Sequence, residues 1–381
     1  MQRCIQLLAA AALCAAAQAK VNILMIASDD MRPEIADPYG IPFMHTPNIA
    51  RLAKAGTSFR FAYCQVAVCA PSRTALLTGV RNDWTRVWTI GPYFRASMGT
   101  QADPAIFKTL PQMFKEHGYN TTGAGKIFHG GGPSGGQGCC GGYDMPFSWT
   151  EPYWDCDQFW TQLVQSPASV NWTYGAGNTA QDKPPYFKFV QSGTGCVQSP
   201  ECIACLTEHS GLGHELSWAA APCDDSCYPD GLVAEQTIRA LRYKASHPEQ
   251  PFFLAAGFKR PHLGFYAPQW AYDLYPNASI ALAQHRTPPA GMPQPAFCEY
   301  GSMRTFEDTD KGAMFINSSE LSSPATPGKS FQVKLLPDWK HYELRRGYYA
   351  AVSFVDAQVG KLLDTLEQLE LRENTAVLMW G

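Results

Sequence analysis

Short apolar runs recur along this chain of 381 residues and have the length of buried β-strands. Two of them hold apolar residues at nearly every position, which is typical of strands covered on both faces of a parallel sheet: residues 21–27 and 251–258. Two further segments fit strands, residues 119–124 and 375–380.

Segments with helical periodicity separate these strands. The expected helices are residues 45–53, 107–117 and 229–245, followed by a long helix from His341. In the last one, apolar side chains recur at helical spacing and are assigned to the core: Val352, Val355, Val359, Leu362, Leu363 and Leu366. Strands that alternate with helices predict an α/β fold.

Two acidic residues, Asp29 and Asp30, follow the first expected strand directly. In open α/β sheets, ligands bind beyond the carboxyl ends of the strands, so this pair is well placed for a site. Adjacent carboxylates repel each other unless a cation lies between them, and a hard cation with oxygen ligands fits there. The alternative is a helix cap before Met31.

Basic side chains follow two other expected strands. Gly125-Lys126-Ile127-Phe128-His129 comes after the second, and Lys259-Arg260-Pro261-His262 comes after the third. Taken alone, Lys126 and His129 are also explained as a solvated surface pair, and His262 as a packed loop histidine.

A cysteine stands at an expected helix start, in Val68-Cys69-Ala70-Pro71-Ser72-Arg73. Pro71 fixes φ near the helical value and suits the first helical position. Backbone N–H groups at such a start favour an anion, and Arg73 adds a permanent positive charge. The pattern indicates a reactive Cys69, while the alternative is a buried thiol before an ordinary helix.

Composition narrows the class of protein. The chain is 45% hydrophobic, so it can bury a large core, and we expect one large domain with a smaller appendage. A net charge of −3 gives no general signal for nucleic acid or a membrane surface, so local positive charge must meet any anionic substrate. No segment after residue 19 reaches 18 apolar residues, and no membrane span is expected.

The first 19 residues have the pattern of a secretory signal peptide. Arg3 supplies the positive start, residues 5–17 are apolar, and Ala17-Gln18-Ala19 forms a small-x-small cleavage site. The pattern predicts passage through an oxidising compartment. Four glycosylation sequons agree with that compartment, at Asn120, Asn171, Asn277 and Asn317.

Cysteine usage points to the same compartment. Of 13 cysteines, Cys4 and Cys14 lie in the signal segment, and Cys69 is set aside for chemistry. The other ten allow up to five disulfides of undetermined connectivity: Cys64, Cys139, Cys140, Cys156, Cys196, Cys202, Cys205, Cys223, Cys227 and Cys298.

Residues 130–228 differ in character from the rest of the chain. The segment 130–142 holds eight glycines, and eight cysteines fall between Cys139 and Cys227. We interpret residues 130–228 as a disulfide-stapled insertion around the substrate mouth. The spacing Cys202-x2-Cys205-x17-Cys223-x3-Cys227 also comes near that of a zinc ribbon, which is the alternative to disulfides.

The motif Cys69-x-Pro71-Ser72-Arg73, followed by Thr-x-x-Leu-Thr-Gly, resembles the signature of the type I sulfatases. An apolar strand that ends in Asp-Asp also opens these enzymes and their alkaline-phosphatase-like relatives. The resemblance implies a large mixed, mostly parallel sheet sandwiched by helices. It also implies that a formylglycine-generating enzyme converts Cys69 to formylglycine, and that Asp29, Asp30 and the modified Cys69 hold one calcium ion.

Other segments resemble the iduronate-2-sulfatase-like enzymes within this family. Gly-Lys-x-x-His implies that Lys126 and His129 reach the sulfate, and Arg260-Pro261-His262 is similar to a Lys-Pro-His segment whose histidine contacts the sulfate ester. Arg260 and Gly264 depart from that pattern, which has a lysine and a second proline. Residues 348–360 continue the likeness, which covers nearly the whole mature chain apart from the insertion.

The resemblance implies a calcium-dependent sulfuric ester hydrolase. Its expected substrates are sulfate esters of polysaccharides or oligosaccharides, with 2-O-sulfate on uronic acids foremost. Arg73, Lys126 and His129 would stabilise the developing charge, and His262 would give a proton to the leaving alcohol. The alternatives are a phosphodiesterase or phosphonate hydrolase of the same superfamily and an inactive carbohydrate-binding homologue. The expected location is lysosomal or extracellular.

The last expected strand leads to Gly381, where the sequence stops. In the family, this strand continues into an Asp/Asn-His-Gly segment that adds two site residues, and a second lysine follows. We therefore expect residues 20–381 to be a sulfatase N-terminal catalytic domain that lacks the C-terminal part of its site.

Overall fold

The computed structural model describes residues 20–96, 107–135, 142–155, 200–209, 216–276, 280–285, 306–312 and 337–381. Its strands are β1 (Asn22–Ser28), β2 (Asn120–Gly125), β3 (Trp218–Ala221), β4 (Phe252–Phe258), β5 (Phe265–Pro268) and β6 (Thr375–Trp380). Its α-helices are α2 (Pro47–Lys54), α3 (Cys69–Thr78), α4 (Asn82–Thr85), α5 (Leu110–Glu116), α7 (Pro200–His209), α8 (Pro229–Ala245), α9 (Gln269–Asp273) and α11 (Asp338–Gln368).

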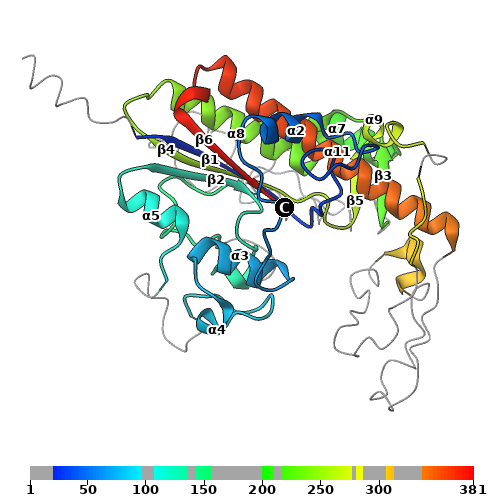
Figure 1. Ribbon diagram of the computed structural model, residues 1–381, viewed down its shortest axis with the longest axis horizontal. Coiled ribbons are helices and arrows are strands. Elements are labelled where there is room, and N and C mark those ends of the chain that lie inside the picture. The colour runs from blue at the N-terminus through cyan, green and yellow to red at the C-terminus, as the bar shows by residue number, and fades with distance from the viewer. Residues whose placement is uncertain are drawn as a thin grey trace, which may run out of the picture.

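The four strands expected from the sequence form one parallel sheet in the order β2-β4-β1-β6 (Figure 1). In the register of this sheet, Ser28 at the end of β1 lies opposite Phe258 at the end of β4. Gly125 at the end of β2 lies opposite Gly257. The carboxyl ends of these three strands therefore meet at one edge, and the polar segments that follow them are brought together there.

Helices cover both faces of this sheet (Figure 1). On one face, Leu24 and Leu254 belong to a core shared with α2, α8 and α11. On the other face, Met25 and Phe253 belong to a core shared with Leu77 of α3. Because successive residues of a strand point to opposite faces, the two central strands β1 and β4 are apolar at nearly every position. Burial of each large apolar side chain contributes about 1.5–3 kcal/mol. The predicted sandwich of helices around a mostly parallel sheet is confirmed.

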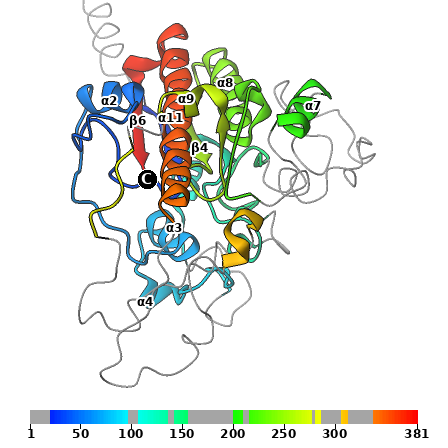
Figure 2. The ribbon, with the colours of Figure 1, turned by 90° about the vertical axis from the view of Figure 1, so that its right-hand side faces the viewer.

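The long helix α11 runs between α2 and α8 (Figure 2). All six apolar side chains assigned to its core-facing side are buried. Asp356, also on this helix, accepts hydrogen bonds from the backbone N–H groups of Asn48 (3.0 Å) and Ile49 (2.7 Å). These groups begin α2, where the helix has no partner of its own for them, so α11 caps α2 from outside.

Several element boundaries differ from those expected, including the starts of three helices. The helix predicted from Phe107 begins at Leu110, because the Thr109 side chain accepts a hydrogen bond from the N–H of Gln112 and caps it. The long helix begins at Asp338 rather than His341, directly after Pro337. Pro71 is the third residue of α3 and not the first, since the helix begins at Cys69.

A second, two-stranded parallel sheet pairs β3 with β5. The four cysteines with zinc-like spacing form two disulfides, Cys202–Cys227 and Cys205–Cys223, which fasten α7 to the segment before α8. The preference for disulfides over zinc is confirmed for these four residues. Cys64 corrects the cysteine count, because it is exposed and unpaired and so cannot belong to one of five bridges.

Asn120 was expected to be a glycosylation site, and the structure contradicts this. Its side chain is buried at the start of β2, where its amide donates to Glu151 (2.9 Å) and its carbonyl accepts from Lys244. A glycan on this amide would have no room in the folded chain and would break both hydrogen bonds.

Several predictions lie outside the described residues. They include the signal peptide at residues 1–19, the sequons at Asn171, Asn277 and Asn317, and five cysteines: Cys139, Cys140, Cys156, Cys196 and Cys298. Among the described residues, no helix has the length and apolar character needed to cross a bilayer.

We predict that Asn120 carries no glycan in protein secreted from a eukaryotic host, although Asn120-Thr121-Thr122 satisfies the acceptor motif. The physical reason is its burial against Glu151 and Lys244. Peptide mass mapping before and after treatment with a glycan-releasing amidase checks this. Asn120 converted to aspartate by that enzyme would contradict the prediction.

Candidate active site

Asp29 lies at the centre of the residues gathered at the carboxyl edge of the sheet. It comes directly after β1, and its N–H donates to the carbonyl of Phe258 (3.0 Å), which extends the pairing of β1 with β4 by one residue. Its carboxylate is buried, with one oxygen 2.7 Å from Nη2 of Arg73 and the other bonded to Nζ of Lys126. The predicted acid and two predicted cationic groups are therefore in direct contact.

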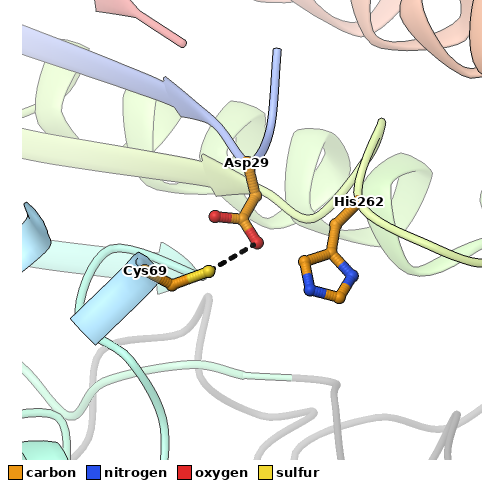
Figure 3. A group of neighbouring side chains, drawn as sticks. All are labelled: Asp29, Cys69 and His262. Atoms are coloured by element: carbon orange, nitrogen blue, oxygen red, sulfur yellow. Dashed lines mark hydrogen bonds between the residues drawn. The ribbon is translucent and has the colours of Figure 1, made fainter. Parts of the chain in front are cut away.

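Cys69 is the first residue of α3, and its Sγ lies 4.0 Å from Oδ2 of Asp29 (Figure 3). Arg73 lies one helical turn later, on the same side of α3. Its Nη1 donates to the carbonyl of Ile127 (2.9 Å) as well as to that of Lys126. Arg73 thus joins the helix that carries Cys69 to the loop that carries Lys126.

Two glycines bring this loop close to β4. A Cβ on Gly257 would lie 2.3 Å from the backbone carbon of Lys126, and one on Gly125 would lie 2.1 Å from the carbonyl oxygen of Gly257. Neither position has room for a side chain, and Gly125 also has a positive φ of 72°. The N–H of Lys126 donates to the carbonyl of Gly257 (2.8 Å), and Lys126 turns toward Asp29.

His262 reaches the same edge from the loop after β4. Its ligand atom, one from Cys69 and one from Asp29 lie within 4.8 Å of one another (Figure 3). Its Nδ1 lies 2.7 Å from the carbonyl of Leu263, which can only accept, so Nδ1 carries the proton. Nε2, 3.9 Å from Oδ2 of Asp30, is then the free ring nitrogen at the site.

The other two predicted site residues lie at the periphery of this group. Asp30 has a positive φ of 58°, and its side chain is 56% exposed, against 5% for Asp29. Its carbonyl accepts from the hydroxyl of Tyr348 on α11 (3.0 Å). His129 follows Lys126 by three residues, and its Nδ1 bonds to the carbonyl of Gly130 (3.0 Å). The structure thus places all seven predicted residues around the carboxyl edge of the sheet.

The charges of this group act on one another strongly. Burial tends to raise the pKa of Asp29, but Arg73 and Lys126 outweigh it, so the pKa lies well below its ordinary value and Asp29 is ionised. Burial, assisted by the positive charge of Lys126, lowers the pKa of both His129 and His262. Both histidines are therefore mainly neutral at pH 7, while Arg73 and Lys126 carry the positive charge.

The Cys69 thiol is not activated as a nucleophile. Burial is the largest cause that raises its pKa above the ordinary value, and the carboxylates of Asp29 and Asp30 add to it. Lys126 and Arg73 oppose this shift without reversing it. Since the thiolate is the reactive form, Cys69 as a plain cysteine would be a weak nucleophile and a weak metal ligand.

A divalent cation fits the acidic part of this group by donor chemistry. Asp29 and Asp30 offer carboxylate oxygens, the ligands that calcium prefers. The oxygen of Asp29 nearest to Cys69 is bonded to Lys126, so a cation bound by that oxygen would compete with the ammonium group. Asp29 and Asp30 would hold the ion, and the neutral thiol of Cys69 would contribute little before modification.

Two buried residues to which the sequence assigned no role in the site position His262. Asp230, the second residue of α8, accepts from the N–H groups of Lys259 (2.7 Å) and Arg260 (2.9 Å). The Arg260 side chain is buried over the ring of Tyr266 and donates to the carbonyl of His262 (2.8 Å). Arg260, which departs from the family pattern, therefore holds the His262 loop from inside.

The sequence signal for these two roles is weak. Asp230 stands in Pro229-Asp230-Gly231, which reads as an ordinary helix start with an acid in its first turn. Its actual partners lie 29 and 30 residues further along the chain, and no local pattern points to them.

The fold and the side chains at its edge define an α/β protein with a strand-end site in which one buried carboxylate contacts two cationic side chains and one cysteine. A model of the sulfatase family matches residues 21–381. The chain therefore belongs to the sulfatase family.

Known proteins resemble the chain over most of its length. Iduronate 2-sulfatase of Mus musculus is 32% identical over 357 residues, which make up 94% of this chain and 53% of that protein. The chain thus spans about half the length of this curated relative.

Solved structures share the fold. A phosphonate monoester hydrolase from Silicibacter pomeroyi has a TM-score of 0.55 at 16% sequence identity, covering 94% of this chain and 62% of that one. A protein crystallised with D-glucosamine-2-N,6-O-disulfate has a TM-score of 0.52 at 16% identity, covering 94% and 65%. The predicted alkaline-phosphatase-like fold is confirmed by these likenesses.

Proposed function

We propose that this chain forms part of a sulfuric ester hydrolase that uses formylglycine at position 69 and one calcium ion. The observation that carries the proposal is the contact of Cys69 with Asp29, itself held by Arg73 and Lys126, with His262 beside them. A sulfate ester is an anion, and this group combines fixed positive charge with a nucleophile position at one helix start.

The unactivated thiol supports modification of Cys69. A cysteine hydrolase needs a thiolate, and here burial raises the pKa of the Cys69 thiol. Formylglycine at this position would supply, as its hydrate, a hydroxyl group that attacks sulfur. A calcium ion on Asp29 and Asp30 would lower the pKa of that hydroxyl group and offset charge on the sulfuryl oxygens.

The chain's own residues would orient and neutralise the sulfate. Arg73 is fixed by Asp29 and by two carbonyls, so its guanidinium needs no reorganisation when substrate arrives. Lys126 and His129 lie on the neighbouring loop and would stabilise the remaining charge. His262 would first take up a proton from solvent on its free Nε2 and would then give that proton to the leaving alcohol oxygen as the ester S–O bond breaks.

The proposed substrates are sulfated polysaccharides or oligosaccharides, with 2-O-sulfate on uronic acids foremost. The likeness to iduronate 2-sulfatase of Mus musculus supports this class, and a structure of the same fold was solved with a sulfated glucosamine. A formylglycine-generating enzyme would act on the chain before folding is complete. We propose a lysosomal or extracellular location, which the two disulfides support.

A second candidate is phosphonate or phosphate ester hydrolysis. The phosphonate monoester hydrolase of Silicibacter pomeroyi shares the fold, although at 16% identity that likeness supports the architecture and not the substrate. The same cations would bind a phosphoryl group, so the site's charge does not separate the two reactions.

One comparison of substrates tests the proposal. The whole enzyme of which this chain forms part is produced in a secretory host. It is incubated with a 2-O-sulfated uronate disaccharide, and separately with an aryl phosphonate monoester and an aryl phosphate diester, each with excess calcium. We expect kcat/KM for the sulfate ester to exceed that for either phosphorus ester by at least about 100-fold, or about 2.7 kcal/mol of transition-state stabilisation. The reverse order would establish the second candidate instead.

A further inference from the structure

Exposed aromatic side chains are frequent in the sequence on both sides of the helix that carries Cys69. Half of the large apolar side chains that are exposed in the described part of the chain lie between Phe59 and Ile90. Two of them are tryptophans, Trp84 with 71% and Trp88 with 51% of their surface exposed. Indole rings exposed to this extent on a soluble domain are typical of binding surfaces.

The backbone under these two rings is fixed to α3. Asn82 is buried, and its side-chain amide donates to the carbonyl of Pro71 (3.0 Å) and to that of Val87 (2.7 Å). Pro71 is two residues from Cys69, in the first turn of α3. One buried amide thus ties the segment that carries the tryptophans to the start of the candidate catalytic helix.

Exposed and buried side chains alternate along this segment. Thr85 and Val87 are buried, whereas Trp84, Arg86 and Trp88 are exposed. Arg86 has a positive φ of 56°, closes the single turn of α4, and its N–H donates to the carbonyl of Asn82 (2.8 Å). We call Trp84, Arg86 and Trp88 the tryptophan ridge.

The chemistry of the ridge matches one kind of ligand. Indole faces pack on the apolar C–H faces of sugar rings, and a guanidinium binds sulfate or carboxylate groups with two N–H donors. Residues 79–90 carry two arginines and one aspartate, a positive segment in a chain whose net charge is −3. Tryptophan and arginine are also among the residue types that most often dominate binding energy at interfaces.

We propose that the tryptophan ridge binds sugar units of a sulfated saccharide next to the unit whose sulfate enters the site at Cys69. This inference rests on the proposed function and adds a subsite to it. Through the Asn82–Pro71 contact, the subsite holds a fixed position relative to Cys69. Binding at a distance from the reacting sulfate would favour long chains over single sugars.

The test measures how affinity grows with saccharide length. A heparin-derived disaccharide and hexasaccharide are titrated calorimetrically into the protein without substitutions, into the double variant Trp84→Ala/Trp88→Ala and into Arg86→Asn. Asparagine is chosen at position 86 because it tolerates a positive φ. We expect the hexasaccharide to bind the protein without substitutions at least about 10-fold more tightly than the disaccharide. The double variant should lose this gain, and Arg86→Asn should lose part of it.

Trp339→Ala is the matched control. The exposed fraction of Trp339, 53%, is similar to that of Trp88. Trp339 lies at the start of α11, however, and not in the segment of α3 and α4. This variant should keep the gain with length. The assignment would be overturned if the double variant kept the same gain in affinity with saccharide length as the protein without substitutions. It would also be overturned if Trp339→Ala lost as much of this gain as the double variant.

Turnover separates this inference from the proposed function. Hydrolysis of the sulfated disaccharide depends on the Cys69 site, whereas the gain in affinity with length is an equilibrium property of the ridge. A protein that binds the hexasaccharide through Trp84 and Trp88 but hydrolyses no sulfate ester would refute the proposed function and leave the ridge as a saccharide site. Hydrolysis of the sulfate ester by a protein in which Trp84 and Trp88 add no affinity for the hexasaccharide would refute the ridge and leave the proposed function standing.

Discussion

Replacing Cys69 with alanine should lower kcat for a 2-O-sulfated disaccharide by about 10⁶-fold, the order of magnitude for removing a catalytic nucleophile. Two side chains among the described residues bond to Oδ2 of Asp29, Cys69 and Lys126. Lys126 contacts it as an ammonium group, which has no lone pair, so position 69 supplies the nucleophile. Single-turnover hydrolysis in the presence of calcium measures the effect. The fold should persist, since a smaller side chain fits at the first residue of α3.

Cys64→Ala is the matched control for that substitution. Cys64 is a second unpaired thiol, five residues earlier, and it is exposed. This variant should retain full turnover. Mass analysis of the peptide that contains residue 69 adds an independent readout, because conversion of a cysteine to formylglycine lowers the mass by about 18 Da. Full turnover by Cys69→Ala, or by protein whose Cys69 is entirely unmodified, would refute the mechanism.

Replacing Asp144 with asparagine should lower the free energy of unfolding by about 3–5 kcal/mol, the cost of leaving a buried charge without its partner. The Asp144 carboxylate accepts two hydrogen bonds from Arg95, at 2.6 and 2.7 Å, and both side chains are fully buried. Tyr93 and Ser148 donate to the same carboxylate. Asparagine keeps the shape and tolerates the positive φ of 60°, but it removes the negative charge that faces the guanidinium of Arg95.

Urea unfolding followed by circular dichroism measures this loss. The control is Lys108→Ala, which breaks the exposed pair between Lys108 and Glu116. Such surface pairs contribute only about 0–1 kcal/mol, because solvent screens both charges. Similar shifts of the urea midpoint for the two variants would contradict the assignment of stability to the buried network.

The sequence predicted which residues lie together at the edge of the sheet, because most of them follow strands. Asp29, Lys126 and His262 each lie just after an apolar run, and parallel strands bring their carboxyl ends to one edge. Cys69 and Arg73 were found from a helix-start motif, and the spacing of four residues put them on one side of α3. Local patterns and one rule of topology predicted the placement of these residues, whereas their roles in the site were taken from the resemblance to the sulfatases.

Other parts of the structure could not be predicted in this way. Arg95 and Asp144 are 49 residues apart and form a pair that no spacing rule foresees. Asn120 satisfies a glycosylation motif, but the motif carries no information about burial, which depends on Lys244 from α8. Cys64 completed an even count of cysteines, yet it is unpaired because pairing depends on distance in space.

The close approach of Gly125 and Gly257 has a consequence for how this protein could be altered. Beside Lys126, main chain packs directly against main chain, and neither glycine leaves room for one additional carbon atom. Laboratory evolution toward new esters would therefore find almost no accepted changes there. Accepted substitutions would instead fall in exposed segments such as residues 84–88, whose side chains face solvent. These residues can change without moving Lys126 away from Asp29.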